Sequence, residues 1–335
     1  MSAPAISVLL PVRDAAATLP ACLRSIARQS EPDFECVIVD DGSQDGSLAL
    51  ARRVARADAR FRVLARPPEG LVESLNAGLA ACRGRYLARM DADDLMHRRR
   101  LARQRAALDH DDDLAAVGCH VRCFPRSALG PGMRAYEAWL CSLRDADDVA
   151  RDAYVECPLP HPSWFARCEV MRTLGYRDEG WPEDYDWLLR ARARGLRLGV
   201  VPERLLSWRR GSQRLSANHP AYAIERFTAC KAHHLAEGFL AGAPRYVLWG
   251  YGGTGRALCR ALAERGRRPS HIVELHPGRL GQSIQGAAVI PPEALAKLPP
   301  TPLIVSVAGA GPRARIRAAL ARMRRREGRD FVCAA

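Results

Sequence analysis

The stretch Val37-Ile38-Val39-Asp40-Asp41-Gly42-Ser43 decides the fold of the first half of the chain. Its three β-branched residues end a buried strand that we expect over 34–39, and the acidic pair with Gly42 marks a turn at the carboxyl end of that strand. A second acidic turn, Asp91-Ala92-Asp93-Asp94, follows another apolar run at 86–90. Both turns therefore end strands of one predicted sheet.

Strand-like and helix-like stretches alternate outward from these turns. We expect strands over 6–10, 34–39, 61–64, 86–90 and 114–124, and helices over 15–29, 48–57, 71–81 and 99–108. Such alternation predicts an α/β fold with a mostly parallel sheet. Ligands of such sheets bind beyond the carboxyl ends of the strands, so the two acidic turns are expected on one rim.

The rest of the chain divides at Gly242-Ala243-Pro244. The middle, 130–215, is rich in Pro and Trp and is expected to be irregular, and 221–241 is expected to be a helical connector. Strand and helix patterns restart at 246 and continue to 325. We therefore predict a first domain over 1–241 and a smaller Rossmann-like α/β domain over 242–335.

Composition limits the partners of the chain. The formal net charge is +14, and lysine occurs only at 231 and 297, so arginine carries the charge. An arginine-rich solvated surface explains most of this excess, while attraction to phosphates or to an anionic membrane surface stays open. The basic runs lack interleaved aromatic residues, so no nucleic-acid partner is expected.

Compartment is predicted from what the sequence does not contain. No apolar run approaches the ~18 residues of a membrane span, and Met1 to Leu10 has no basic n-region or cleavage site. The eleven cysteines form no C-x-x-C pair, as is typical of a reducing compartment. We expect a cytoplasmic protein, with peripheral association at the inner membrane surface left open.

Asp91 and Asp93 form a D-x-D pair that suits a divalent cation. Mg²⁺ and Mn²⁺ bind carboxylate and phosphate oxygens together, so two aspartates suffice as protein ligands. On an extended segment, residues two apart point the same way, and both carboxylates would then face one ion. The alternative is that Asp93 or Asp94 caps the helix that follows.

In order and spacing, the motifs Ile6 to Pro11, Val37 to Ser47, Leu75 to Leu79 and Arg89 to Asp94 resemble those of family 2 glycosyltransferases with a GT-A fold. The resemblance covers residues 5 to about 218. It implies that Asp41 binds the uracil of a UDP-sugar donor, with Pro11 and Val12 beside the nucleoside. It also implies Asp93 as a direct metal ligand, with Asp91 on the ribose or the metal. A D-D-G-S turn is the structural alternative for Asp41.

Pro182-Glu183-Asp184-Tyr185-Asp186 resembles the E-D helix start of that family, whose aspartate is the general base. Asp184 is therefore the predicted catalytic base, since a carboxylate near a helix N-terminus is stabilised as an anion; simple capping is the alternative. Helical spacing places Asp186 on a different side of the helix from Asp184, so Asp186 is expected to be a surface or structural residue. His161, Glu183 and Trp181 are expected at the acceptor cleft, with ordinary core packing as their alternative.

Leu206 to Ser216 resembles the family's donor-closing loop, where Arg209 or Arg210 would neutralise the diphosphate. Gly211-Ser212 stands where many members have histidine, which puts metal coordination by the loop in doubt. The chain lacks Q-x-x-R-W, so a processive polymerase is not expected.

Gly250-x-Gly252-x-x-Gly255 follows a strand, and Glu274 ends the next one. This is the context of a dinucleotide site, so NAD(P) binding stays open beside a docking or dimerising role. A homo-oligomer is likewise open.

The resemblance implies a hexosyltransferase-like enzyme of cell-surface polysaccharide or glycoconjugate biosynthesis. It would move a sugar from a nucleotide diphosphate, with inversion, to a hydroxyl of a saccharide, lipid-linked or protein acceptor, using Mn²⁺ or Mg²⁺. The rivals are a dinucleotide-dependent oxidoreductase or sugar modifier acting through the C-terminal domain, and a non-catalytic scaffold.

Overall fold

A computed structural model describes residues 3–211, 214 and 218–335. The chain divides into two compact units, each built from several segments. The first comprises Met1–Ala150, Leu159–Glu179 and Arg190–Asn218, and the second Arg151–Pro158, Gly180–Leu189 and His219–Ala335. The second unit thus includes segments from before residue 242, and the boundary expected there stays a prediction.

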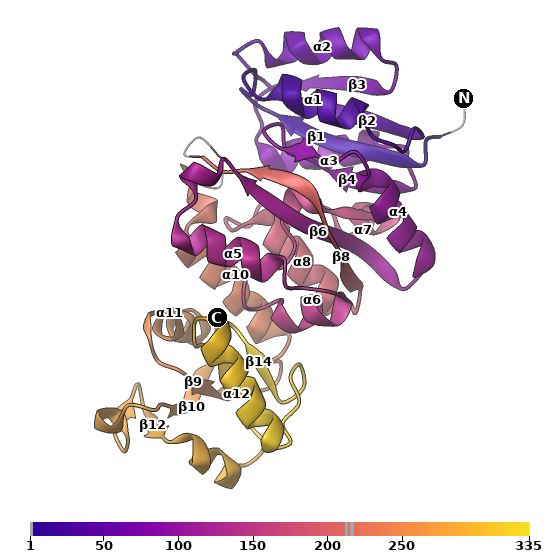
Figure 1. The fold of residues 1–335 in the computed structure, drawn as a ribbon. Helices are drawn as coiled ribbons and strands as arrows, with labels where there is room; N and C mark the ends of the chain where they lie inside the picture. The colour runs from indigo at the N-terminus through magenta and orange to yellow at the C-terminus, as the bar shows by residue number, and fades with distance from the viewer. Residues whose placement is uncertain (1–2, 212–213, 215–217) are drawn as a thin grey trace. The chain divides into compact units, whose positions relative to one another are not determined.

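The first unit is built on an eight-stranded mixed sheet in the order β3-β2-β1-β4-β7-β6-β8-β5 (Figure 1). Its strands are β1 (Ile6–Val12), β2 (Phe34–Asp41), β3 (Phe61–Arg66), β4 (Tyr86–Arg89), β5 (Leu95–Met96), β6 (Leu114–Phe124), β7 (Phe165–Arg167) and β8 (Arg197–Arg209). β3, β2, β1 and β4 run parallel, and β7 is antiparallel to both β4 and β6. The carboxyl ends of β2, β1 and β4 therefore lie on one edge, as predicted.

Helices connect these strands. They are α1 (Leu19–Ala27), α2 (Ser47–Ala57), α3 (Leu71–Ala81), α4 (Arg100–His110), α5 (Pro131–Leu140), α6 (Ala146–Asp152) and α7 (Cys168–Leu174). α1 buries Leu19, Leu23 and Ile26, which helical spacing places on one face. On α3, a Cβ at Gly78 would lie 2.2 Å from Cδ1 of Leu9 on β1, so only glycine permits this close helix–strand packing.

The second unit has a six-stranded sheet in the order β11-β12-β10-β9-β13-β14. Its strands are β9 (Arg245–Trp249), β10 (Arg268–Val273), β11 (Ser283–Ile284), β12 (Ala287–Ile290), β13 (Leu303–Val305) and β14 (Phe331–Cys333). All pairings are parallel except β11 with β12. The helices are α10 (Ile224–Glu237), α11 (Gly253–Ala263), α12 (Ala310–Arg322) and the start of α8 (Glu183–Ala193). The strand order is one that doubly wound sheets use, while the Rossmann-like assignment stays a prediction.

The expectation that 130–215 is irregular is wrong. That segment contains α5, α6, β7, α7, α8 and the long strand β8. β8 pairs in parallel with β6, where Leu114 lies opposite Arg197, 83 residues later in the chain, and Pro202-Glu203-Arg204 interrupts the apolar pattern of β8. The helical connector is present as α10.

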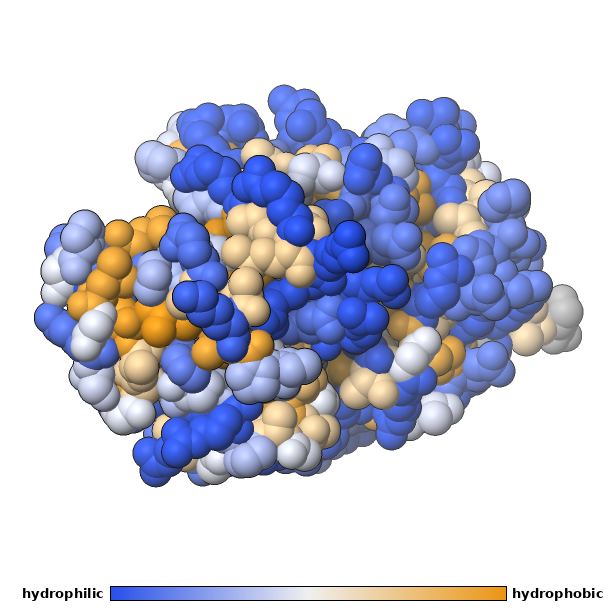
Figure 2. Space-filling view, turned by 90° about the horizontal axis from the view of Figure 1, so that it is seen from below, coloured by the Kyte–Doolittle hydropathy of each residue, from blue (hydrophilic) through white to orange (hydrophobic). Residues whose placement is uncertain are grey.

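The surface hydropathy and the state of the cysteines agree with what the composition indicated. Among the described residues, no helix is both long and apolar enough to cross a membrane. All eleven cysteines are free thiols. Hydrophilic residues cover most of the face shown in Figure 2, with a group of hydrophobic ones at its left. In the described chain the exposed large hydrophobic residues are Ile224, Leu275 and Leu280.

Candidate functional site

Asp91, Asp93 and Asp94 gather at the carboxyl end of β4 and form the carboxylate turn. The Asp94 amide donates to the Asp91 carbonyl at 3.3 Å, so the chain turns here. One carboxylate oxygen of each residue lies within 4.8 Å of the other two. The extended geometry expected for D-x-D is therefore wrong, and the turn adds Asp94, which pattern reasoning passed over. Asp93 and Asp94 also do not cap the helix that follows, because α4 begins only at Arg100.

Two arginines neutralise the carboxylate turn in part. Arg89 is ion-paired with Asp91. Arg214 lies 3.0 Å from Asp91, 3.7 Å from Asp93 and 3.6 Å from Asp94, with its side chain only 12% exposed. Three carboxylates thus face two guanidinium groups. Arg214 lies within the loop motif noted in the sequence, but its role there was missed.

Burial and charge act against each other on the carboxylate pKa values. Burial raises the pKa of Asp91, but the Arg89 and Arg214 guanidiniums outweigh it and hold that pKa below its usual range. Burial and the Asp91 charge together raise the pKa of Asp93, and they raise that of Asp94 further. A further cation beside the turn would therefore stabilise the ionised form of these carboxyl groups.

Asp94 and Arg209 fix the shape of the turn. The backbone amide of Arg209 donates to Oδ1 of Asp94 at 2.6 Å, and the side-chain Nε of Arg209 donates to the Asp93 carbonyl at 2.7 Å. The Arg209 guanidinium also packs over the Phe124 ring at 4.6 Å. In this structure Arg209 holds the backbone of the turn, and its expected contact with a diphosphate stays a prediction.

The donor set of the carboxylate turn fits Mn²⁺ or Mg²⁺. Oxygen ligands are the ones that these hard cations prefer. Asp94 is fully buried, and its Oδ2 has no hydrogen-bond partner among the described residues. A buried carboxylate oxygen without a donor is costly, and a cation beside it would remove that cost.

The acidic pair at the end of β2 has divided roles. Asp40 accepts from the Ser43 amide at 3.1 Å, so Asp40 makes the turn contact. Asp41, also buried, accepts from the amides of Glu69 and Gly70 at 2.8 and 3.1 Å and pairs with Arg13 at 3.1 Å. Asp41 is thus a fixed acceptor on the predicted rim.

Pro11 and Val12 end β1 beside that pair. Val12 is in register with Asp40 on the neighbouring strand. Both residues are buried. Their place at the strand end agrees with the predicted nucleoside position, which stays a prediction.

His161 is a bonded, buried histidine. Its Nε2 lies 2.9 Å from the Tyr176 hydroxyl, and its ring packs on Trp164 with centroids 4.6 Å apart. Its charge, when protonated, lowers the pKa of Asp91. A structural histidine beside the carboxylate turn explains these contacts, and its acceptor role stays a prediction.

Comparisons with known proteins place this geometry in a family. The family model described as Glycosyl transferase family 2 matches residues 7–174, which include the carboxylate turn and Asp41. The chain is 30% identical to the putative glycosyltransferase EpsE of Bacillus subtilis over 69% of this chain and 83% of that protein. It is 25% identical to an uncharacterized glycosyltransferase of Haemophilus influenzae over 64% and 69%.

The chain belongs to glycosyl transferase family 2. It is a glycosyltransferase, as the resemblance implied. Its fold is that of solved GT-A enzymes. The mannosyltransferase PcManGT of Pyrobaculum calidifontis aligns with TM-score 0.55 and 18% identity over 96% of this chain and 81% of that one. TarS of S. aureus aligns with TM-score 0.56 and 16% identity over 77% and 70%.

The predicted base of this glycosyltransferase lies in the second unit. Asp184 is in the first turn of α8, and its Oδ1 accepts from the Tyr185 amide at 2.7 Å. Buried Glu183 accepts from the Tyr222 hydroxyl at 2.5 Å. The carboxylate turn belongs to the first unit, so the meeting of Asp184 with it stays a prediction.

Two further residues of the E-D segment have defined partners. Trp181 donates from its indole to Asp186 at 3.3 Å and packs on His233. Asp186 is fully buried, so the prediction of a surface position is wrong, while the alternative of a structural role stays a prediction. The acceptor roles of Trp181 and Glu183 stay predictions.

The glycine turn after β9 has the geometry that its pattern requires. Gly250 has φ +97°, and a Cβ there would lie 2.5 Å from Val307 Cγ2. A Cβ at Gly255 would lie 2.2 Å from the Gly250 carbonyl oxygen, whereas Gly252 faces open space. Glu274 is ion-paired with Arg279 at 3.0 Å. The turn is thus explained by packing alone, and dinucleotide binding stays a prediction.

The donor-closing loop is described only in part. Its residues Ser212, Gln213, Leu215 and Ser216 lie outside the described residues. Arg210 stacks over Trp208 at 4.7 Å. Arg209 and Arg210 are the two arginines predicted to contact the diphosphate. Among the ion pairs of the described residues, neither is paired with a carboxylate, whereas Arg214 is.

Proposed function

We propose that this glycosyltransferase moves a sugar from a UDP-sugar to an acceptor hydroxyl with inversion, without processive elongation. The observation that carries the proposal is the carboxylate turn, with three clustered carboxylates at the carboxyl end of β4 in a family 2 chain. We place the reaction in polysaccharide or glycoconjugate biosynthesis, with a saccharide, lipid-linked or protein acceptor.

Similar proteins support a nucleotide-sugar donor but differ in its base. The solved TarS structure is a complex with UDP-GlcNAc, and that of PcManGT is a complex with GDP-Man and Mn²⁺. A 98-residue segment is 39% identical to a PGL/p-HBAD biosynthesis glycosyltransferase of Mycobacterium tuberculosis. We favour UDP because Asp41 offers a fixed carboxylate acceptor for the N–H of uracil.

The chain's own residues then have separate tasks. Asp91 and Asp93 would hold the ion, with Asp94 bracing them through Arg209. When bound, Mn²⁺ or Mg²⁺ would neutralise charge on the diphosphate. Arg214, beside the same oxygens, supplies a positive charge that can bind the diphosphate. Asp41 orients the nucleoside.

Asp184 is proposed as the general base. Its position in the first turn of α8 favours the anion, which can accept the proton of the acceptor hydroxyl. The acceptor oxygen would attack C1 from the side opposite the diphosphate, so no covalent enzyme intermediate forms. One base beyond the carboxylate turn is enough for such a displacement.

The test combines turnover and product stereochemistry. Asp184→Asn should lower kcat by ~10²–10⁴-fold while donor affinity is kept. Asp147→Asn is the matched control, because Asp147 is an exposed aspartate in the first turn of α6. NMR of the product from an α-linked donor should show a β linkage. An α linkage, or near-normal turnover of Asp184→Asn, would overturn the mechanism.

Donor identity is tested by thermal shift with a nucleotide-sugar panel. A ligand that binds only the folded state raises the unfolding temperature. With Mn²⁺ present, UDP-sugars should raise it more than GDP-sugars do. A larger shift with GDP-sugars would reassign the base and leave the transferase proposal intact.

The cellular location of the enzyme is a further proposal. We infer a cytoplasmic enzyme that associates with the inner membrane surface through its arginine excess. Binding to vesicles of anionic lipid that weakens with salt would support this, and equal binding to neutral vesicles would contradict it.

A further inference from the structure

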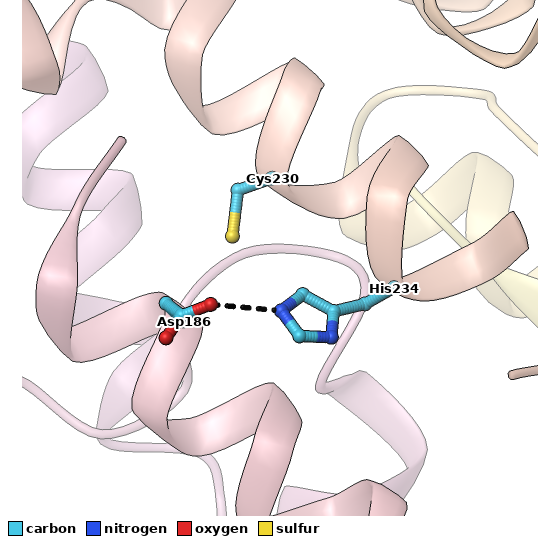
Figure 3. A group of neighbouring side chains, drawn as sticks. All are labelled: Asp186, Cys230 and His234. Carbon is cyan, nitrogen blue, oxygen red and sulfur yellow. Dashed lines mark hydrogen bonds and ion pairs between the residues drawn. The ribbon is translucent and has the colours of Figure 1, made fainter. Parts of the chain in front are cut away.

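A second cluster of metal-binding side chains has no chemical role assigned above. Asp186 on α8 and Cys230 and His234 on α10 are all buried, and their ligand atoms lie within 4.8 Å of one another. Figure 3 shows the Cys230 sulfur pointing toward the Asp186–His234 hydrogen bond. All three residues belong to the second unit.

The helix geometry explains why these side chains converge. Cys230 and His234 are four residues apart on α10 and therefore share one helix face. His234 Nε2 lies 3.1 Å from Oδ1 of Asp186, which crosses from α8. The nitrogen and oxygen are thus already as close as two ligands of one ion.

The distances are near those of a zinc site. Zinc binds thiolate, imidazole and carboxylate at about 2.0–2.3 Å in a tetrahedron, so its ligand atoms lie about 3.3–3.7 Å apart. Closing the cluster from its present limit of 4.8 Å requires side-chain shifts of about 1 Å, which rotamer adjustment supplies.

Charge also favours a divalent ion here. A thiolate, a carboxylate, a neutral imidazole and a divalent cation sum to zero charge. The sulfur and nitrogen donors distinguish this cluster from the all-oxygen carboxylate turn and favour zinc over Mn²⁺ or Mg²⁺.

We propose that Asp186, Cys230 and His234 bind one zinc ion that ties α8 to α10. Three protein ligands leave a fourth position for water. Asp186 stands two residues after Asp184, so the ion would fix the helix that carries the proposed base. The ion would cross-link the two helices, although its three protein ligands differ from the four of a closed zinc site, and the proposal holds whether or not Asp184 is that base.

The test is the metal content of the 335-residue chain. The protein is purified with reductant, loaded with equimolar zinc and passed over a weak chelating resin. Elemental analysis should find about one zinc ion per chain. Cys230→Ser and His234→Asn should lose it. Cys259→Ser, which changes another buried thiol of the same unit, and Asp93→Ala should both keep it.

A cobalt-loaded wild-type sample tests the same ligands without mutation. Sulfur coordination should give a charge-transfer band in the near ultraviolet, so the test stands even if a variant fails to fold. Zinc should also raise the unfolding temperature of the wild type and not that of Cys230→Ser. Wild type that keeps no zinc and shows no cobalt band would overturn the proposal, as would zinc retained by Cys230→Ser. The Asp186–His234 contact would then be a hydrogen-bonded cross-link alone.

Discussion

At the scale of single residues, Arg214 is the most informative side chain of the candidate site. Its guanidinium lies 3.0–3.7 Å from all three aspartates of the carboxylate turn. A divalent ion bound by the same carboxylates would compete with it for their oxygens. Arg214 thus stabilises the turn without metal, and we expect its guanidinium to pair with the diphosphate once an ion takes its place at the carboxylates.

Arg214→Ala should therefore destabilise the metal-free protein and strengthen its response to Mn²⁺. Leaving three clustered carboxylates with Arg89 alone costs ~1–3 kcal/mol of unfolding free energy. Thermal unfolding with and without Mn²⁺ measures both effects. Arg210→Ala is the control, because Arg210 packs on Trp208. If the two variants respond alike to Mn²⁺, Arg214 and the ion do not compete.

The sequence predicted individual carboxylates better than their arrangement. Asp91 and Asp93 were found because a D-x-D pair ends an apolar strand. Arg214 pairs with Asp91 across 123 positions of sequence. Asp94 was passed over because the segment was taken as extended, whereas it turns. Contacts of this kind depend on the tertiary fold, and no local spacing encodes them.

At the scale of elements, α10 joins two distant segments of the second unit through one lysine. Nζ of Lys231 donates to the Val155 carbonyl at 3.0 Å and to the Ala334 carbonyl at 2.7 Å. Burial lowers the pKa of Lys231 to about 8, although the nearby Glu156 charge raises it; Cys230 also raises it and Arg313 lowers it. Lys231 thus links α10 to Ala334 through an amine whose charged form is disfavoured by burial.

This lysine predicts a rise in stability with pH. In the unfolded chain its pKa is about 10.4, so between pH 8 and that value the unfolded state binds more protons than the folded state. Stability from this group should rise across that window by about 3 kcal/mol and be constant below it. Denaturant unfolding at several pH values, compared with Lys231→Met, isolates the effect from the buried thiols, whose raised pKa values act oppositely. Equal pH slopes in both proteins would contradict it.

Local pattern found the elements whose apolar spacing is uninterrupted. α3 spans Leu71–Ala81 as predicted, because its apolar spacing and Gly84 are local signals. β8, by contrast, was missed within a Pro- and Trp-rich segment, because Pro202 and the charged residues after it interrupt its apolar run.

At the scale of the whole molecule, each of the two compact units is assembled from several segments of the chain. Residues 151–158, 180–189 and 219–241 belong with the C-terminal sheet. Arg317 pairs with Asp152 at 2.6 Å, and Lys231 bonds the Ala334 carbonyl. No composition shift in the sequence marks such interleaving.

A chain ending at 241 tests the boundary proposed at 242. If the boundary is right, this chain should fold and bind UDP with Mn²⁺. Loss of the contacts to Asp152 and Lys231 should lower its unfolding temperature. Circular dichroism and UDP titration measure both properties, with the full chain as the control. An insoluble product would mean that the segments before 242 need the C-terminal sheet.

The central claim is that the carboxylate turn binds a divalent ion and, through it, the nucleotide diphosphate. The most direct measurement is calorimetric titration of UDP into the full chain with and without Mn²⁺, for wild type and for Asp93→Ala. The account predicts Mn²⁺-dependent binding by the wild type and loss of at least ~10-fold in affinity for Asp93→Ala, with the fold intact by circular dichroism. Undiminished Mn²⁺-dependent UDP affinity in folded Asp93→Ala would contradict it.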